Sequence, residues 1–166
     1  ANMLTAYYSR GCDSRKLFQG LKIATHPDFE KHLNQYNVIH LNMRDYLTES
    51  ENMKQLIQFV EDDLLDELQQ EFSDLRMPRR KTLVKVLEQA FAQYKIPFVF
   101  IIDEWDCIFR VHKSDAASQK EYLDFLRNLL KDKSYIALAY MTGILPIKKY
   151  GEHSAINVFY EYSMTD

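Results

Sequence analysis

Apolar residues follow two different spacings along this chain, and each spacing predicts a different element. Three short, nearly continuous apolar runs predict buried strands at residues 38–42, 98–103 and 135–142. Between them, apolar residues recur every three or four positions, as in amphipathic helices. Buried strands that alternate with such helices are typical of an α/β fold, in which a parallel sheet has helices on both faces.

The helical period is clearest in three segments, at about residues 51–75, 79–95 and 118–132, and a short opening helix is compatible with residues 1–9. Pro78 is expected to end the first of the three, because proline interrupts helical hydrogen bonding.

Composition narrows the classes of protein. With 21 Lys and Arg residues against 24 Asp and Glu, the formal net charge is -3, which argues against a dominant nucleic-acid surface. No apolar run approaches the ~20 residues that cross a bilayer, so we expect no membrane association. Cys12 and Cys107 lie far apart in sequence, which favours a reducing compartment and a cytoplasmic location over a disulfide framework or a zinc site.

Acidic residues follow the second apolar run. The segment FVFIIDEWD places Asp103 and Glu104 directly after five apolar residues, and Asp106 one position later. Four or more apolar residues followed by Asp-Glu is the Walker B pattern of many P-loop ATPases. In that interpretation Asp103 supports Mg²⁺, directly or through water, and Glu104 is the general base. The alternative is that these acids cap the following turn or pair with a nearby Arg or Lys.

Thr142 ends the third predicted strand, so Asp103 and Thr142 both fall at strand ends, where ligands usually bind in parallel sheets. Its hydroxyl is a candidate contact for a γ-phosphate or an attacking water, and a bond to nearby backbone is the alternative. Asp106 is either a partner behind these groups or an exposed acid.

The basic residues are less specific. Arg110, Lys148 and Lys149 are candidates for phosphate contacts or are simply solvated, and the cluster RMPRR from Arg76 is predicted to be a solvated turn. None of the five histidines has a metal-binding spacing such as HExxH. The chain also has no GxxxxGK[ST] phosphate loop (Walker A), so we expect no tightly bound nucleotide or other cofactor on this chain alone.

Three segments, SRGCDSRKLFQGLKIA, FVFIIDEWDCIFR and ALAYMTGILPIKKYGEHSAINVFYEYSM, together resemble the predicted AAA-ATPase-like family of bacterial proteins. The resemblance implies a hydrolase that uses ATP and Mg²⁺, with Asp103 and Glu104 on Walker B and Thr142 on the sensor strand. It further implies that residues 1–166 are one partial domain, truncated at both ends, with Walker A just upstream. Members often carry a nuclease-like domain downstream.

The resemblance also implies a strand order of 38–42, 98–103, 135–142, with the Walker B strand in the middle. The last strand would then lack its neighbour, and an open apolar edge invites association. We therefore expect that this chain is marginally stable alone, or that its first helix or a second copy covers that edge.

Three functions follow from these observations. The first is a segment of an ATP-binding and ATP-hydrolysing domain, inactive without Walker A. The alternative is a degenerate ATPase-like module for protein interaction. The third is a Mg²⁺-dependent nuclease or phosphohydrolase that uses Asp103, Glu104 and Asp106, and it needs further carboxylates or a lysine at the same place.

Overall fold

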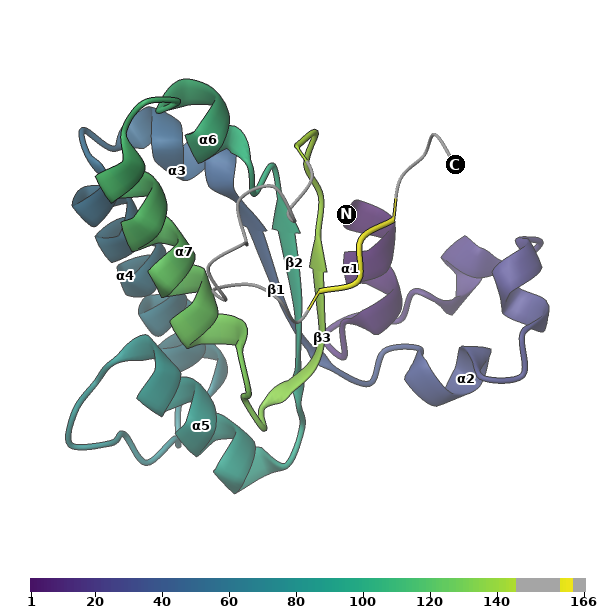
Figure 1. The fold of residues 1–166 in the computed structure, drawn as a ribbon. Coiled ribbons are helices and arrows are strands. Elements are labelled where there is room, and N and C mark those ends of the chain that lie inside the picture. The colour runs from purple at the N-terminus through teal and green to yellow at the C-terminus, as the bar shows by residue number, and fades with distance from the viewer. Residues whose placement is uncertain (146–158, 163–166) are drawn as a thin grey trace.

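A three-stranded parallel sheet forms the centre of the computed structural model, which describes residues 1–145 and 159–162 (Figure 1). Its strands are β1 (Asn37–Asn42), β2 (Phe98–Asp103) and β3 (Ile136–Met141), in the order β1-β2-β3. The predicted fold class and strand order are therefore confirmed, with β2, which ends at Asp103, in the middle.

Helices cover both faces of this sheet, as predicted. Figure 1 shows α4, α5 and α7 on one face and α1 on the other. The helices are α1 (Asn2–Tyr8), α2 (Phe29–His32), α3 (Met43–Glu49), α4 (Met53–Glu71), α5 (Leu83–Tyr94), α6 (Cys107–Val111) and α7 (Ala116–Leu130), with 3₁₀ turns at Arg15–Phe18 and Lys22–Thr25. None of these described helices combines the length and apolar character needed to cross a membrane.

The longest helix, α4, shows why these segments are helical. Its buried residues Leu56, Val60, Leu64 and Leu68 recur every four positions and form one apolar stripe. The side chain of Asn52 caps its start by accepting a hydrogen bond from the backbone N–H of Gln55 at 3.0 Å.

The prediction that Pro78 ends this helix is wrong, because α4 already stops at Glu71. The chain leaves helical geometry at Phe72, whose buried ring packs against Tyr94 and Phe98 with centroid distances of 4.8 and 6.4 Å. Tertiary packing of one aromatic ring therefore sets the end of the helix.

Strand β2 is buried along its whole apolar length. Phe98, Phe100 and Ile102 belong to the main core, together with buried residues of α4, α5 and α7. Val99 and Ile101 alternate with them, are fully buried, and lie toward the opposite face, where α1 packs on β1 and β2. A strand covered on both faces explains the nearly continuous apolar run in the sequence.

Strand β3 is the more exposed edge of the sheet. No described strand pairs with its outer side, and Leu138 and Tyr140 remain 36% and 43% exposed. Helix α1 packs mainly on β1 and β2 and leaves these two side chains accessible, so of the expected alternatives the first helix does not cover them. Marginal stability alone and pairing with a second copy stay predictions.

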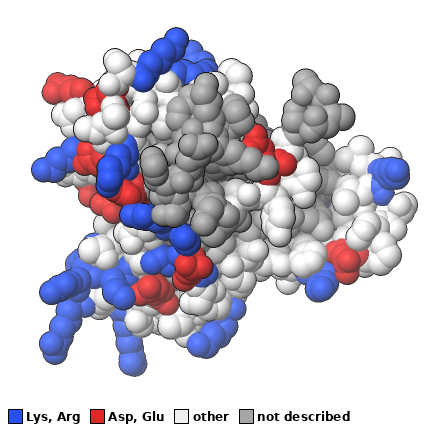
Figure 2. All heavy atoms as spheres, viewed as in Figure 1, with Lys and Arg blue, Asp and Glu red and all other residues white. Residues whose placement is uncertain are grey.

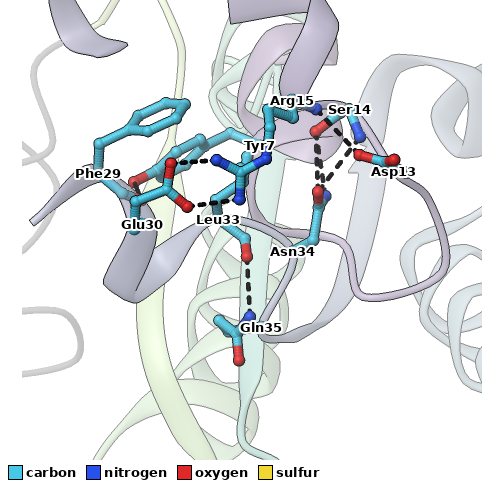
Figure 3. A network of polar contacts seen from close by, with 9 residues as sticks. All are labelled: Tyr7, Asp13, Ser14, Arg15, Phe29, Glu30, Leu33, Asn34 and Gln35. Carbon is cyan, nitrogen blue, oxygen red and sulfur yellow. Dashed lines mark hydrogen bonds and ion pairs between the residues drawn. The ribbon is translucent and has the colours of Figure 1, made fainter. Parts of the chain in front are cut away.

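A small lobe between α1 and β1 was not predicted. Phe18, Phe29 and Leu33 form a separate apolar cluster, against which Tyr7 packs. Polar contacts hold the lobe together: the Tyr7 hydroxyl donates to the carbonyl of Phe29 at 2.8 Å, and Arg15 pairs with Glu30 (Figure 3). These contacts join residues without any helical or strand period, so the sequence pattern carries no signal for them.

The main core should be sensitive to loss of volume. Leu87 on α5 is fully buried, and Leu87→Ala should lower the free energy of unfolding by about 2–5 kcal/mol, since it leaves a cavity. The matched change Leu17→Ala, at a side chain that is 68% exposed, should cost about 0.5 kcal/mol or less. Urea denaturation measures both, and equal effects would contradict the core described here.

Candidate functional site

The predicted site residues meet at the carboxyl-terminal edge of the sheet. Asp103 is the last residue of β2, and Thr142 directly follows β3. Asn42, the last residue of β1, lies opposite Asp103 in the strand pairing. Parallel strands end at one edge, and this shared edge brings together residues 39 positions apart in sequence.

Both carboxylate oxygens of Asp103 have partners. The Thr142 hydroxyl donates to Oδ1 at 2.6 Å, and Nε2 of His40, on β1, lies 3.0 Å from Oδ2. The Asp103 side chain is 24% exposed, so it stays accessible from solvent. His40 was not singled out from the sequence, although its signal is visible as the one ionisable side chain in the strand NVIHLN.

Opposing effects set the pKa of the Asp103 carboxyl. Partial burial raises it, but hydrogen bonds from Thr142 and His40 and the positive amino terminus of Ala1 together bring the pKa below its ordinary value. Helix α1 packs on β1 and β2 and ends beside Tyr36, just before β1, so its start points toward this edge of the sheet. Because the folded-state pKa is lowered, this carboxylate stabilises the fold above its unfolded pKa, and that contribution is lost as pH falls through the lowered value.

Glu104 follows in an unusual backbone conformation. Its φ of 54° lies in the left-handed region, which costs a non-glycine residue about 1–2 kcal/mol. Its carboxylate accepts a hydrogen bond from Arg110, and 38% of the side chain remains exposed. Of the alternatives for the acids, pairing with a nearby arginine is therefore observed for Glu104. The N-cap position of α6 belongs to Asp106.

Asp106 is fully buried, so the interpretation of it as an exposed acid is wrong. Its Oδ2 accepts hydrogen bonds from the backbone N–H groups of Ile144 at 3.1 Å and Leu145 at 2.9 Å. Nε of Arg110 lies 3.2 Å from the same oxygen, an ion pair that is not aligned as a hydrogen bond. Asp106 thus joins the turn after β2 to the loop after β3.

Gly143 lies directly against this junction. A Cβ atom there would lie 2.7 Å from Oδ1 of Asp106 and 2.7 Å from two atoms of the Trp105 ring, closer than side-chain carbons are found. Only glycine lets the two loops approach this closely.

The remaining candidates from the sequence are basic residues. Arg76, Arg79 and Arg80 are exposed in the loop between α4 and α5, which confirms the solvated turn. Figure 2 shows basic side chains projecting from the lower left, the region of α5 in Figure 1. Lys148 and Lys149 lie outside the described residues.

The oxygen donors at this edge fit a hydrated Mg²⁺ ion better than a directly ligated metal. Asp103 and Thr142 offer a carboxylate and a hydroxyl that are both accessible, and Mg²⁺ commonly keeps several of its waters. Within the described part of the chain, no group of three or more His, Cys, Asp or Glu side chains is arranged to hold a metal. The nuclease hypothesis loses its third carboxylate, because Asp106 is buried and bound to backbone N–H groups.

Removing the Thr142 hydroxyl should raise the pKa of Asp103, because one of the hydrogen bonds that favours the ionised carboxylate is lost. We expect Thr142→Val to shift the Asp103 carboxyl titration, followed by ¹³C NMR, to higher pH. Thr48→Val, which removes a hydroxyl bound to the Arg44 carbonyl on α3, should leave that titration unchanged. An unchanged titration in Thr142→Val would contradict the described contact.

Comparisons with known proteins bear on the identity of the chain. The family model AAA-ATPase_like, described as predicted AAA-ATPase, matches residues 1–151. Searches of curated proteins and of solved structures found no match.

Proposed function

The chain belongs to the predicted AAA-ATPase family, and from that premise we propose that it forms part of a domain that binds Mg²⁺-ATP and hydrolyses it. The observation that carries the proposal is the 2.6 Å contact between Thr142 and Asp103, at the edge of a parallel sheet where ligands bind. The alternative, a degenerate ATPase-like module for protein interaction, keeps the same fold without the chemistry.

In this proposal each residue at the edge has one role. Asp103 holds Mg²⁺ through water. One accessible carboxylate is enough for this, because Mg²⁺ keeps several of its own waters. Glu104 is the general base, since its side chain is exposed next to Asp103 and can reach a water molecule. Thr142 contacts the γ-phosphate or the attacking water, which its position next to Asp103 supports.

The phosphates need a binding loop that these 166 residues do not contain. We propose that a longer chain supplies a Walker A loop immediately before α1. The direction of α1 supports this, because its start points toward the edge of the sheet that holds Asp103. From the same family resemblance we propose a nuclease-like domain downstream.

The free thiols of Cys12 and Cys107 suit a reducing compartment, and we propose the cytoplasm.

Calorimetric titration with Mg²⁺-ATP tests the proposal on two proteins, the chain and a version extended upstream through Walker A. We expect only the extended protein to bind. Asp103→Asn should weaken that binding about tenfold or more, because one charged contact to the cation is removed. Glu104→Gln should preserve binding and abolish turnover, because the amide cannot accept the proton.

Asp124→Asn is the matched control, since this partly exposed carboxylate on α7 pairs only with Lys120 and Arg127 among the described residues. It should leave binding and turnover unchanged. If neither protein binds Mg²⁺-ATP, the ATPase proposal fails and the interaction module replaces it.

The exposed residues of β3 favour that interaction module as a second candidate. Two copies could pair through this open edge, because its backbone groups have no partner strand among the described residues. We expect the chain to sediment as more than a monomer, and Leu138→Lys to shift it toward monomer, whereas Leu17→Lys in the lobe should not. A monomeric wild-type chain would rule out this pairing.

A further inference from the structure

We propose that Asp106 and Arg110 are positioning residues that hold Glu104 and Thr142 in one fixed arrangement, by joining the turn after β2 to the loop after β3. This inference rests on the proposed function, because it treats Glu104 as the general base. It assigns roles to two residues behind the edge of the sheet, and each link in the connection is visible in the structure.

The first link is the buried carboxylate of Asp106. A charge without solvent exposure is costly unless it is paired and hydrogen-bonded. Oδ2 of Asp106 meets this requirement with two backbone N–H groups, from Ile144 and Leu145, and with the nearby guanidinium of Arg110, whereas Oδ1 accepts no hydrogen bond from the described residues. An apolar residue would fill the same space, so the acid is explained by its partners: it ties the loop after β3 to α6.

The second link is the guanidinium of Arg110. This residue lies on α6 and contacts the carboxylates of both Asp106 and Glu104. Nε lies 3.2 Å from Asp106, and Nη2 donates a hydrogen bond to Oε2 of Glu104. This hydrogen bond to Glu104 raises the pKa of the Arg110 guanidinium, so the cation is retained. A planar guanidinium can hold two acids at once, which the single point charge of lysine does less well.

The third link is the state of Glu104 itself. Oε2 is held by Arg110, whereas Oε1 accepts no hydrogen bond from the described part of the chain. One oxygen is therefore fixed and the other is available for a water molecule. The left-handed backbone of Glu104 is a strained conformation that the surrounding contacts must maintain, as is common at functional sites.

The fourth link connects this arrangement back to Thr142. The backbone N–H of Trp105 donates to the Thr142 carbonyl at 3.1 Å, and the N–H of Thr142 donates to Ile102 at 2.9 Å. Gly143 is packed against Asp106 and Trp105. Thr142 thus lies between two anchored points, so a shift of Asp106 would displace the hydroxyl as well as the base.

Nuclear magnetic resonance on the 166-residue chain tests the connection without any nucleotide. We expect the amides of Ile144 and Leu145 to exchange slowly with solvent, and the guanidinium of Arg110 to rotate slowly. Asp106→Ala should speed the exchange of both amides by about tenfold or more, the change that losing ~1.4 kcal/mol of protection produces. Asp124→Ala should not change them.

A second variant covers the case in which Asp106→Ala does not fold. Glu104→Gln keeps the size of the side chain and removes its charge, so it should release the rotation of Arg110 while the amides of residues 144 and 145 stay protected. Fast exchange of these amides in the wild-type chain, or free rotation of its Arg110, would overturn the proposal.

Steady-state kinetics of the version extended upstream through Walker A separates positioning from a merely structural role. Arg110→Met should lower kcat by roughly tenfold to a hundredfold with little change in KM, as expected when a catalytic group is misplaced after substrate binds. Arg110→Lys should restore part of the loss.

The two proposals can fail separately in these experiments. Normal kcat in Arg110→Met beside an inactive Glu104→Gln overturns the positioning role and keeps the ATPase proposal. Full turnover in Glu104→Gln overturns the base role and therefore the positioning of a base, while the amide exchange still decides whether Asp106 joins the two loops.

Discussion

Strand β2 is covered on both faces, and this burial limits where the chain can place charge. Residues 98–102 are fully shielded between the main core and the side on which α1 packs, so an ionised group among them would lack solvent and partners. Asp103 is the first position along the strand that reaches solvent. The location of the acids at the strand end is therefore a consequence of the core, and so is their proximity to the end of β3.

The turn after β2 departs from ordinary structure in several ways at once. Glu104 has a left-handed backbone, Asp106 is a buried acid, and Gly143 leaves no room for a side chain. The strained backbone alone would cost about 1–3 kcal/mol, and the buried acid would cost more without its partners. Together they support one another, because the close approach at Gly143 brings the N–H groups of Ile144 and Leu145 within reach of Asp106. Residues that are locally unfavourable for stability are expected at functional sites.

The sequence predicted the parts of this molecule that depend on apolar period. The three strands follow from their apolar runs, and the meeting of Asp103 with Thr142 follows because parallel strands end at one edge. The order of the three strands in the sheet was predicted from the family resemblance. The contact of His40 with Asp103 joins residues 63 positions apart, and side-chain reach rather than any pattern decides it. The same holds for the burial of Asp106, since the sequence leaves open whether this acid is exposed or a partner behind the site until its contacts with 144 and 145 are known.

Because β3 is an edge strand of the described sheet, the contacts of Asp106 help to hold the loop that follows it. Thr142 lies at the end of an edge strand that has a partner on one side only among the described residues, and edge strands are held less firmly than central ones. Pairing with β2 fixes the strand up to Met141, opposite Ile102. Thr142 itself is held by hydrogen bonds to Ile102 and Asp103 of β2 and to the N–H of Trp105, and the loop beyond it is held by Asp106. The open edge of β3 therefore ends directly before the residue that joins this strand to the site.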